Sequence, residues 1–216
     1  MYLNVEKLIL NRGERRILGP LDIRVEAGGF LAVRGPNGAG KSTLLRAIAG
    51  LLKPESGTIE IAGDAVSEDL PYQEHCHYFG HLDGLKTALT VAENLLFFQD
   101  LYGGETHLHS VDEALDIVAL PRTRDLPVAY LSAGMRKRVA IARLLLNHRQ
   151  VWLLDEPTSA LDAASQDRLG VMMQSHLDTG GIIVAATHLP LPGAISDVLE
   201  IEPSQSYAPE LGETWL

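Results

Sequence analysis

The feature that most constrains this chain is a glycine-rich loop between an apolar run, residues 30–33, and a helical pattern that begins at Leu44. The loop consists of Gly35, Pro36, Asn37, Gly38, Ala39, Gly40, Lys41, Ser42 and Thr43. It fits the G-x-x-x-x-G-K-[ST] pattern in the strand–loop–helix context that this pattern requires. Residue frequencies give such a string by chance in roughly one chain per hundred of this length. A phosphate-binding loop is therefore favoured over an ordinary glycine turn.

The residue types of this phosphate loop suit a bound phosphate chain. Its glycines let backbone N–H groups approach phosphate oxygens where a side chain would block them. The helix that starts near Lys41 directs free N–H groups and its positive dipole end at the same anion. We expect Lys41 to reach the β- and γ-phosphates and the Ser42 hydroxyl to be a ligand of Mg²⁺.

Length and charge narrow the classes of protein that this chain can belong to. Its 216 residues suit one domain, with room for a small inserted subdomain. The formal net charge of −10 argues against a nucleic-acid partner, because phosphate neutralisation needs a basic surface. Cys76 is the single cysteine, which excludes an intramolecular disulfide and favours a reducing compartment. No signal-peptide pattern and no apolar run of about 20 residues is present, so we expect membrane attachment only through a partner.

Apolar patterns divide the chain into a strand-and-helix core and a helical insertion. Residues 2–9 and 17–25 alternate apolar and polar and predict an antiparallel hairpin. Residues 84–135 show helical spacing only, and helices and strands then alternate, as in a mainly parallel sheet covered by helices. The expected strands are 30–33, 57–61, 76–79, 151–154 and 182–186, with a short element at 197–201, and the expected helices are 41–52, 91–98, 111–118, 134–147 and 163–178.

These patterns predict an α/β fold, namely a P-loop NTPase (RecA-like) core with an antiparallel β edge and an inserted α-helical subdomain. We expect residues 1–216 to form one domain. Its nucleotide-binding core would comprise residues 1–83 and 136–201, its helical subdomain residues 84–135, and its irregular tail residues 202–216.

Two of the expected buried strands deliver polar residues to the edge of the sheet beside the phosphate loop. Asp155 ends the first and can hold Mg²⁺ through water, while Glu156 would face the γ-phosphate and polarise the attacking water. His188 follows the second strand and would contact the γ-phosphate in the same place. We favour these roles over acids and a histidine that merely cap strands, because the phosphate loop lies upstream.

A second helix start is also suited to an anion. Ser132 is a plausible helix cap, and Gly134 leaves the backbone open for approach. Since one nucleotide already has its site at Lys41, the second helix end suggests that a nucleotide is completed by a second copy of the chain.

In this order and spacing the motifs resemble those of the nucleotide-binding subunits of ABC transporters. The resemblance covers residues 2 to about 200 and rests on residues 35–43, 131–135, 154–157, 159–162 and 187–188. It implies an ATPase that uses ATP and Mg²⁺ and works as a head-to-tail homodimer with two ATP molecules at the interface. Each ATP would lie between one phosphate loop and the partner's helix at Ser132, with the segment from Ser159 to Asp162 coupling the two sites across the interface. The metal role falls on Ser42 and Asp155, the water-activating role on Glu156, and the γ-phosphate role on His188.

Residues 77–95 and the short length resemble, more narrowly, the haem-export branch of that family, which serves cytochrome c maturation. This resemblance implies integral membrane permease subunits as partners, a peripheral place on the cytoplasmic face of the inner membrane, and hydrolysis that releases a haem-loaded chaperone. Most of the family has glutamine where this chain has His81, and the haem-export branch shares a histidine there. An imidazole can still contact Mg²⁺ or the attacking water, with a pH-sensitive charge.

Three further positions, in two motifs, depart from the family pattern. The aromatic residue that stacks on adenine is missing near Asn11, so base binding is expected to be weaker or to come from Arg12 or Arg16. Ala133 and Met135 replace a glycine and a glutamine, and the second change removes a polar contact near the dimer interface.

Three remaining features are interpreted as structural. Residues 75–77, His-Cys-His, would not converge on a metal or haem, because on a strand the cysteine points away from the two histidines. The basic run 136–138 is interpreted as a solvated helix face, with a contact to the partner's γ-phosphate as the alternative. We expect Phe97, Phe98 and Tyr102 to lie in the core of the helical subdomain, with a docking patch as the alternative.

Two rival functions are open at this point. One is the ATPase of an unrelated lipid, drug or polysaccharide exporter, which co-purifying membrane proteins would distinguish. The other is a nucleotide-gated clamp on DNA or the ribosome, which the acidic charge disfavours. For a transporter, we expect the membrane partner to contact the surface near residues 82–95.

Overall fold

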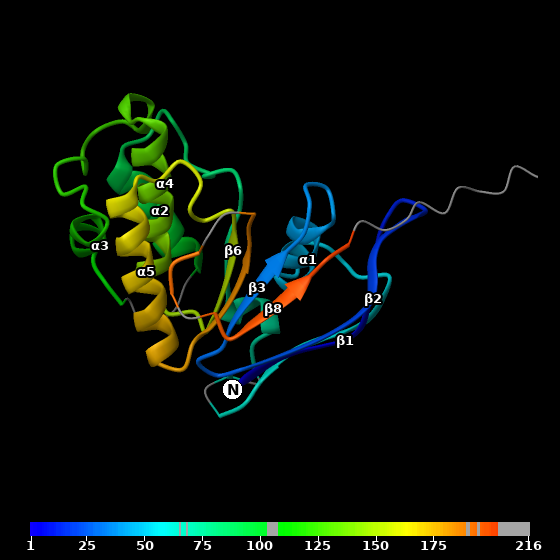
Figure 1. Cartoon of the computed structure of the whole chain (residues 1–216). Coiled ribbons are helices and arrows are strands. Elements are labelled where there is room, and N and C mark those ends of the chain that lie inside the picture. The colour runs from blue at the N-terminus through cyan, green and yellow to red at the C-terminus, as the bar shows by residue number, and fades with distance from the viewer. Residues whose placement is uncertain (65, 68, 103–107, 189–190, 194, 203–216) are drawn as a thin grey trace, which may run out of the picture.

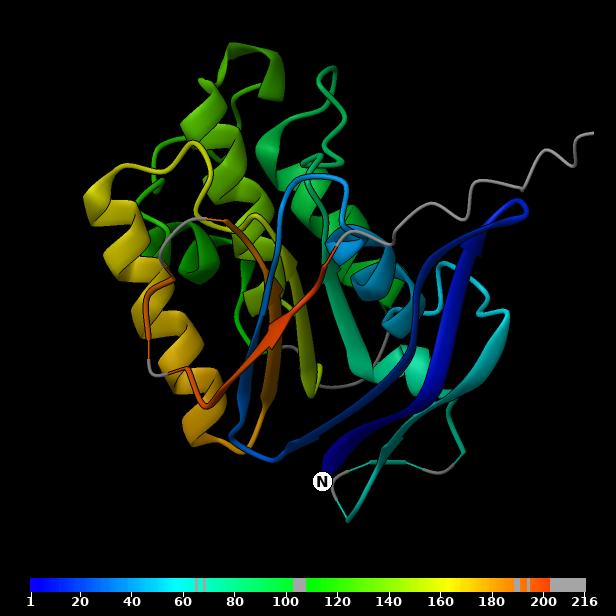
Figure 2. The same cartoon turned by 45° about the vertical axis from the view of Figure 1, so that its right-hand side comes forward.

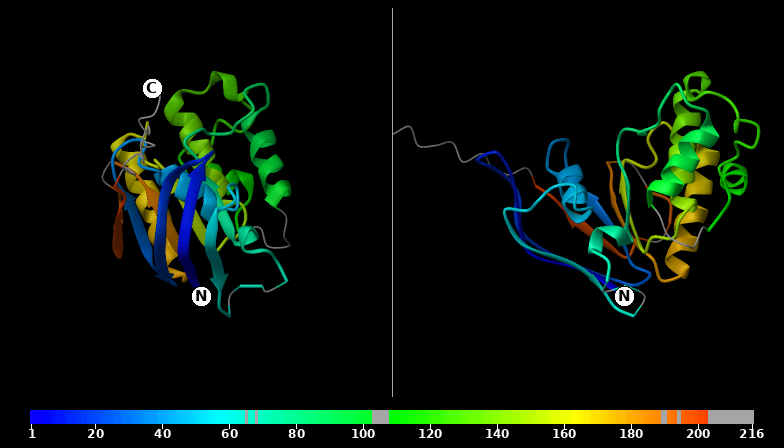
Figure 3. Two further views of the ribbon diagram at one scale, coloured as in Figure 1. Left: turned by 90° about the vertical axis from the view of Figure 1, so that its right-hand side faces the viewer. Right: turned by 180° about the vertical axis from the view of Figure 1, so that it is seen from behind.

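The computed structural model describes residues 1–216 except 65, 68, 103–107, 189–190, 194 and 203–216. A three-stranded antiparallel sheet and a five-stranded parallel sheet form its two β layers, and the long helices lie beyond the parallel sheet (Figure 1). The views in Figure 3 place the antiparallel sheet and these helices on opposite sides of the molecule. This arrangement confirms the predicted α/β class.

The antiparallel sheet has the strand order β2-β1-β4. Its strands are β1 (Tyr2–Arg12), β2 (Arg15–Glu26) and β4 (Ser56–Ala62). Apolar residues of β1 alternate inward, and the buried ones are Leu3, Val5, Leu8 and Leu10. The predicted hairpin is therefore confirmed, with strands a few residues longer than the alternation indicated, because pairing of Asn11 with Arg16 extends it to the turn.

The parallel sheet has the order β5-β6-β7-β3-β8 (Figure 2). Its strands are β3 (Phe30–Arg34), β5 (Cys76–Phe79), β6 (Val151–Asp155), β7 (Ile182–Ala186) and β8 (Asp197–Glu200). Every residue of β6 and β7 is buried, as expected for strands with both faces covered. Because β6, β7 and β3 are neighbours, the loops that leave their carboxyl ends meet at one edge of the sheet.

Helices cover the two faces of the parallel sheet differently. Helix α1 (Lys41–Ile48) packs against β6, β7 and β1, between the two sheets. The other helices are α2 (Val91–Tyr102), α3 (Val111–Ile117), α4 (Ala133–Ala142) and α5 (Ala163–Asp178). Side chains from all four share one hydrophobic core with the opposite face of the sheet, while α1 belongs to a second core shared with the antiparallel sheet.

Strand β6 belongs to both cores. Val151 and Leu153 lie in the core that contains α1, and Trp152 and Leu154 lie in the core that contains the other helices. This alternation follows from the two-residue period of a strand, which sends successive side chains to opposite faces.

Between residues 84 and 135 the described residues form α2, α3, a 3₁₀ turn, Val128–Tyr130, and the start of α4, with one isolated bridge and no strand. A capping box of Ser110 and Glu113 starts α3. Helix α4 is shorter than predicted, since it gives way to a 3₁₀ turn at Arg143–Leu145. The division of the chain into a core, a helical subdomain and a tail stays a prediction.

The prediction that Phe97 lies in the core is wrong. The residue is 53% exposed and its ring touches that of Phe98 edge-on, whereas Phe98 packs against the core as expected. Helix α2 is apolar on more than the face that it buries, so its sequence pattern does not indicate which aromatic residue points inward. The Tyr102 side chain lies outside the described residues. No helix in the described ranges combines the length and apolarity needed to cross a bilayer.

Candidate nucleotide-binding site

The phosphate loop connects β3 to α1 and needs glycine at its first position. Gly35 has a φ of 144°, and a Cβ there would lie 2.3 Å from the Ile201 carbonyl oxygen. Gly40 caps α1 in the left-handed region without any side-chain hydrogen bond, so the first N–H groups of the helix have no capping side chain. An anion is the natural partner for such a helix end, particularly with a lysine at its first position.

Lys41 is held inside the phosphate loop. Its ammonium donates to the carbonyl oxygens of Gly35 at 2.8 Å and Pro36 at 3.0 Å, and the residue is only 7% exposed. The loop thus contains a nearly buried positive charge whose partners here are neutral carbonyls. Phosphate oxygens would provide stronger bonds for the same ammonium, because the acceptor would then be charged as well as the donor.

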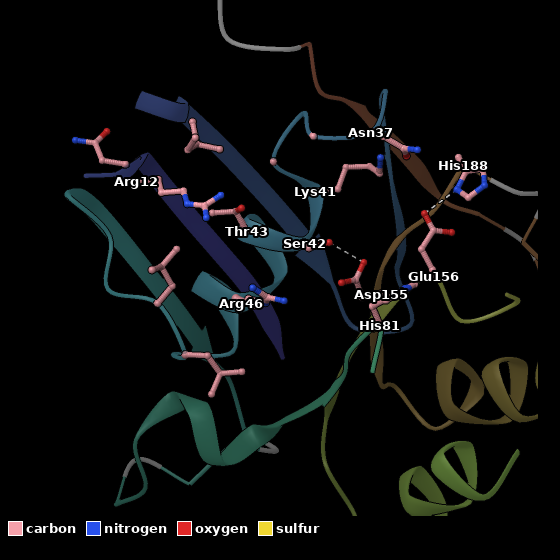
Figure 4. Close-up of a pocket in the computed structure, with 16 residues that line it drawn as sticks. Arg12, Asn37, Lys41, Ser42, Thr43, Arg46, His81, Asp155, Glu156 and His188 are labelled. Carbon is pink, nitrogen blue, oxygen red and sulfur yellow. Dashed lines mark hydrogen bonds and ion pairs between the residues drawn. The ribbon is translucent and has the colours of Figure 1, made fainter. Parts of the chain in front are cut away.

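Asp155 and Ser42 form the part of the site suited to a metal ion. The Ser42 hydroxyl donates to Asp155 Oδ1 at 3.0 Å (Figure 4). Asp155 is 2% exposed, and its Oδ2 is buried without a hydrogen-bond partner among the described residues. Burial of a carboxylate oxygen without a hydrogen-bond donor costs free energy unless a cation or a water molecule binds to it. A hydroxyl and a carboxylate are oxygen ligands of the kind that Mg²⁺ prefers, so the donor set fits this ion.

Glu156 follows Asp155 and is aligned by β7 and the residues after it. Thr187 Oγ1 donates to Glu156 Oε2 at 3.0 Å, and His188 Nδ1 lies 2.9 Å from Glu156 Oε1. The Glu156 side chain is 14% exposed and the His188 side chain 56%, so the histidine covers the solvent side of the carboxylate. Figure 4 shows both side chains at the edge of the sheet, beside Lys41 and Asp155.

A cavity of about 750 Å³ joins these groups. Of the residues that the sequence singled out, it is lined by Asn37, Gly38, Gly40, Lys41, Ser42, Thr43, His81, Asp155, Glu156 and His188. The structure thus brings together most of the predicted phosphate, metal and water groups, including His81, which follows β5. Gly35, Pro36 and Ala39 shape the loop without lining the cavity.

The cavity extends beyond the phosphate loop to residues that could receive a base. Arg12 and Ile17 come from the hairpin, and Leu51 and Leu52 follow α1. Of the two arginines expected near the base, Arg12 lines the cavity and Arg16 does not. Arg46 also lines the cavity and was not predicted, although it follows Ser42 by four residues, a helical spacing that places both side chains on one face of α1.

The residues expected to act on a partner's nucleotide do not line this cavity. Ser132 is exposed and caps α4 by accepting a hydrogen bond from Met135 N at 3.2 Å. Asp162 is exposed and caps α5 in the same way from Ser165 N at 2.8 Å, and hydrogen bonds from the Ser165 hydroxyl and backbone N–H hold the pKa of the Asp162 carboxyl below the ordinary value. Gly134 lies in the first turn of α4, close to the Ala160 carbonyl oxygen. Both helix starts therefore present their first turns to the outside of the molecule.

The prediction that residues 136–138 form a solvated face is wrong. Lys137 is 6% exposed, and its ammonium donates to the Glu156 carbonyl oxygen at 3.0 Å. The Arg136 guanidinium donates to the Leu131 carbonyl oxygen, and that of Arg138 to the Val118 and Ala119 carbonyl oxygens. Each cation therefore binds carbonyl groups of neighbouring segments.

The three residues 75–77 do not converge on a ligand. His75 ends a 3₁₀ turn, Tyr72–His75, whereas Cys76 and His77 lie on β5, which begins at Cys76 as predicted. Burial lowers the pKa of His77 to about 3 and raises that of Cys76 to about 12, so both are neutral at pH 7. No group of three candidate metal ligands occurs among the residues that the structure describes.

Comparison with known proteins gives one family and a set of close relatives. Residues 18–159 match the family model described as ABC transporter. Two relatives are the cytochrome c biogenesis ATP-binding export proteins CcmA of Bradyrhizobium diazoefficiens and Nitrobacter winogradskyi. They are 50% and 52% identical to this chain, each over 88% of it and 94% of the relative.

Solved structures share the fold. A putative ABC transporter ATP-binding protein from Pyrococcus furiosus superposes with a TM-score of 0.77 at 23% identity, covering 93% of this chain and 98% of that one. An ATP-binding cassette in a dimeric post-hydrolysis state with ADP and Pi gives a TM-score of 0.76 at 23% identity, covering 94% and 97%.

Proposed function

This chain belongs to the ABC transporter family of ATP-binding subunits, and we propose that it is the ATPase of an exporter complex that serves cytochrome c maturation by acting on haem. The main support for ATPase activity is that one cavity is lined by Lys41, Ser42, Asp155, Glu156 and His188. Identity of about half the residues to the CcmA relatives supports the assignment to cytochrome c biogenesis.

In the proposed reaction the phosphate loop binds ATP and Glu156 acts on water. Ser42 and Asp155 would hold Mg²⁺, which supplies positive charge to the β- and γ-phosphate oxygens when bound. Glu156, oriented by Thr187 and His188, would accept the hydrogen bond of the attacking water and align it.

We also propose that two copies bind two ATP molecules head to tail. The exposed first turn of α4 at Ser132 and Gly134, and Asp162 at the start of α5, would then contact the nucleotide held by the other copy. Binding of ATP would close the pair, and hydrolysis would reopen it. His81 would contact the metal ion or the water from its place in the same cavity.

The partners would be integral membrane subunits of the CcmB and CcmC type, which place this chain at the cytoplasmic face of the inner membrane. Leu82 is 82% exposed and Leu89 is 38% exposed, on the segment that follows His81. Exposed leucines of this kind suit a protein partner, and their position next to His81 would connect the partner to the nucleotide.

A pull-down from detergent-solubilised membranes tests the proposed function. With the tagged chain as bait, we expect mass spectrometry to identify permeases of the haem-export type, and the captured complex to hydrolyse ATP. Capture of a permease for lipid, drug or polysaccharide export instead would contradict the assignment to haem. Salt-sensitive capture of nucleic acid or ribosomes would contradict transport itself.

Arg12 is expected to contribute to binding of the base. Substitution of Arg12 by alanine should raise the Kd for ATP about three- to tenfold, the range expected for loss of a cation stacked on an aromatic ring. Calorimetry with ATP measures this change, and Arg16→Ala is the matched control because Arg16 does not line the cavity. A larger increase in the Kd for ATP in Arg16→Ala than in Arg12→Ala would show that Arg16, and not Arg12, binds the base.

A further inference from the structure

Lys137 connects helix α4 to the backbone of Glu156. It lies on α4 five residues after the Ser132 cap, and its ammonium donates to the Glu156 carbonyl oxygen at 3.0 Å. The same ammonium lies 4.4 Å from the centre of the Phe79 ring on β5, the strand that leads to His81. This side chain of α4 therefore contacts two other segments of the protein.

The buried position of Lys137 does not explain its charge by a gain in the stability of the folded protein. Burial lowers its pKa to about 8, although the carboxylates of Asp155, Glu156 and Asp83 act in the opposite direction. Burial therefore makes the ammonium less favourable here than in water, although a side chain with a pKa of about 8 still carries its charge at pH 7. An apolar side chain of similar length would fill the space without this desolvation cost. A buried cation in such a place calls for another explanation.

The backbone conformation of Glu156 explains why a cation is buried at this position. Glu156 has a φ of 49°, a conformation that residues other than glycine rarely adopt. Its N–H donates to Ala186 O at 2.8 Å, and its carbonyl oxygen also accepts a bond from Ser159 Oγ at 2.9 Å. Lys137 adds a donor from α4 to this carbonyl, so it helps to hold the strained turn that directs the carboxylate towards the cavity.

We propose that Lys137 is a positioning residue for ATP hydrolysis, which fixes the Glu156 turn to the helix that begins at Ser132. Lys137 does not line the cavity, so its effect on the reaction passes through Glu156. The inference rests on the proposed function, because it assigns a role in the reaction of the same site.

The test compares two substitutions of nearly equal size in the complex purified with its membrane subunits. Lys137→Met removes the donor and keeps an unbranched chain beside Phe79, whereas Lys137→Gln keeps an N–H donor. We expect Lys137→Met to lower kcat for ATP about tenfold or more, since small displacements of a catalytic group are that costly, with KM unchanged. Lys137→Gln should recover most of the lost kcat.

Thermal unfolding separates positioning from a structural role. Below pH 8 the Tm of Lys137→Met should equal or exceed that of the parent, because the substitution removes a buried charge. Lys7→Met, at an exposed lysine of β1, is the matched control and should change neither kcat nor Tm.

Two results would overturn the inference. One is a kcat of Lys137→Met equal to that of the parent. The other is an equal loss of kcat in Lys137→Met and Lys137→Gln with a lowered Tm in both, which would make Lys137 structural. An inactive parent complex would overturn the proposed function, and this inference with it.

Discussion

Replacing Lys41 with alanine is expected to weaken ATP binding by at least about a hundredfold, because each charge-assisted hydrogen bond contributes about 1.5–3 kcal/mol. The ammonium is already inside the phosphate loop, bound to the Gly35 and Pro36 carbonyl oxygens and 7% exposed. It can therefore reach phosphate oxygens without moving to the surface first. No other lysine lines the described part of the cavity.

Isothermal calorimetry with ATP and Mg²⁺ measures this loss. Lys7→Ala removes an exposed lysine of the antiparallel sheet and should keep the parent's Kd. Circular dichroism should show the same helix and strand content in both variants. An unchanged Kd in Lys41→Ala would remove the central premise of the proposed site.

Replacing Glu156 with glutamine should lower the rate of hydrolysis by about a hundredfold or more, the usual contribution of a positioned general base. Glutamine keeps the size of the side chain, and its amide oxygen can still accept the Thr187 hydroxyl bond that now measures 3.0 Å. What it loses is the negative charge that orients and polarises water. ATP should therefore bind and remain intact, and the variant should accumulate as a closed dimer.

Size-exclusion chromatography with and without ATP, together with phosphate release, measures both effects. The matched control is Glu60→Gln, an exposed carboxylate on β4, which should leave turnover and oligomeric state unchanged. Turnover of Glu156→Gln at the parent's rate would refute the assignment of Glu156. A monomeric variant that retains ATP would refute the proposed dimer instead.

The phosphate loop and its neighbours could be predicted from the sequence because local rules place them. A glycine-rich loop between a strand and a helix has few possible geometries, and Asp155 and His188 each follow a short apolar run. Once the runs are recognised as adjacent parallel strands, their ends must share an edge. The structure confirms that these residues line one cavity, while their roles stay predictions.

Lys137 and Phe97 were misinterpreted because their surroundings come from distant parts of the chain. A basic residue amid other basic residues on a helix favours exposure, and only the packing of α4 against Phe79 and Glu156 buries Lys137. An aromatic residue on an apolar helix favours burial, and only the orientation of α2 exposes Phe97. Tertiary contacts decide both cases, and a single sequence does not contain them directly.

The membership of β6 in two cores has a mechanical consequence. Because its side chains are buried on both faces, the strand that presents Asp155 cannot slide or tilt without loosening packing on both sides. The buried side chains of α2 and α3 that the structure describes belong to one core only. A swing of these two helices would disturb a single interface, so the fold combines a stiff frame for chemistry with a region that can reorient at lower cost.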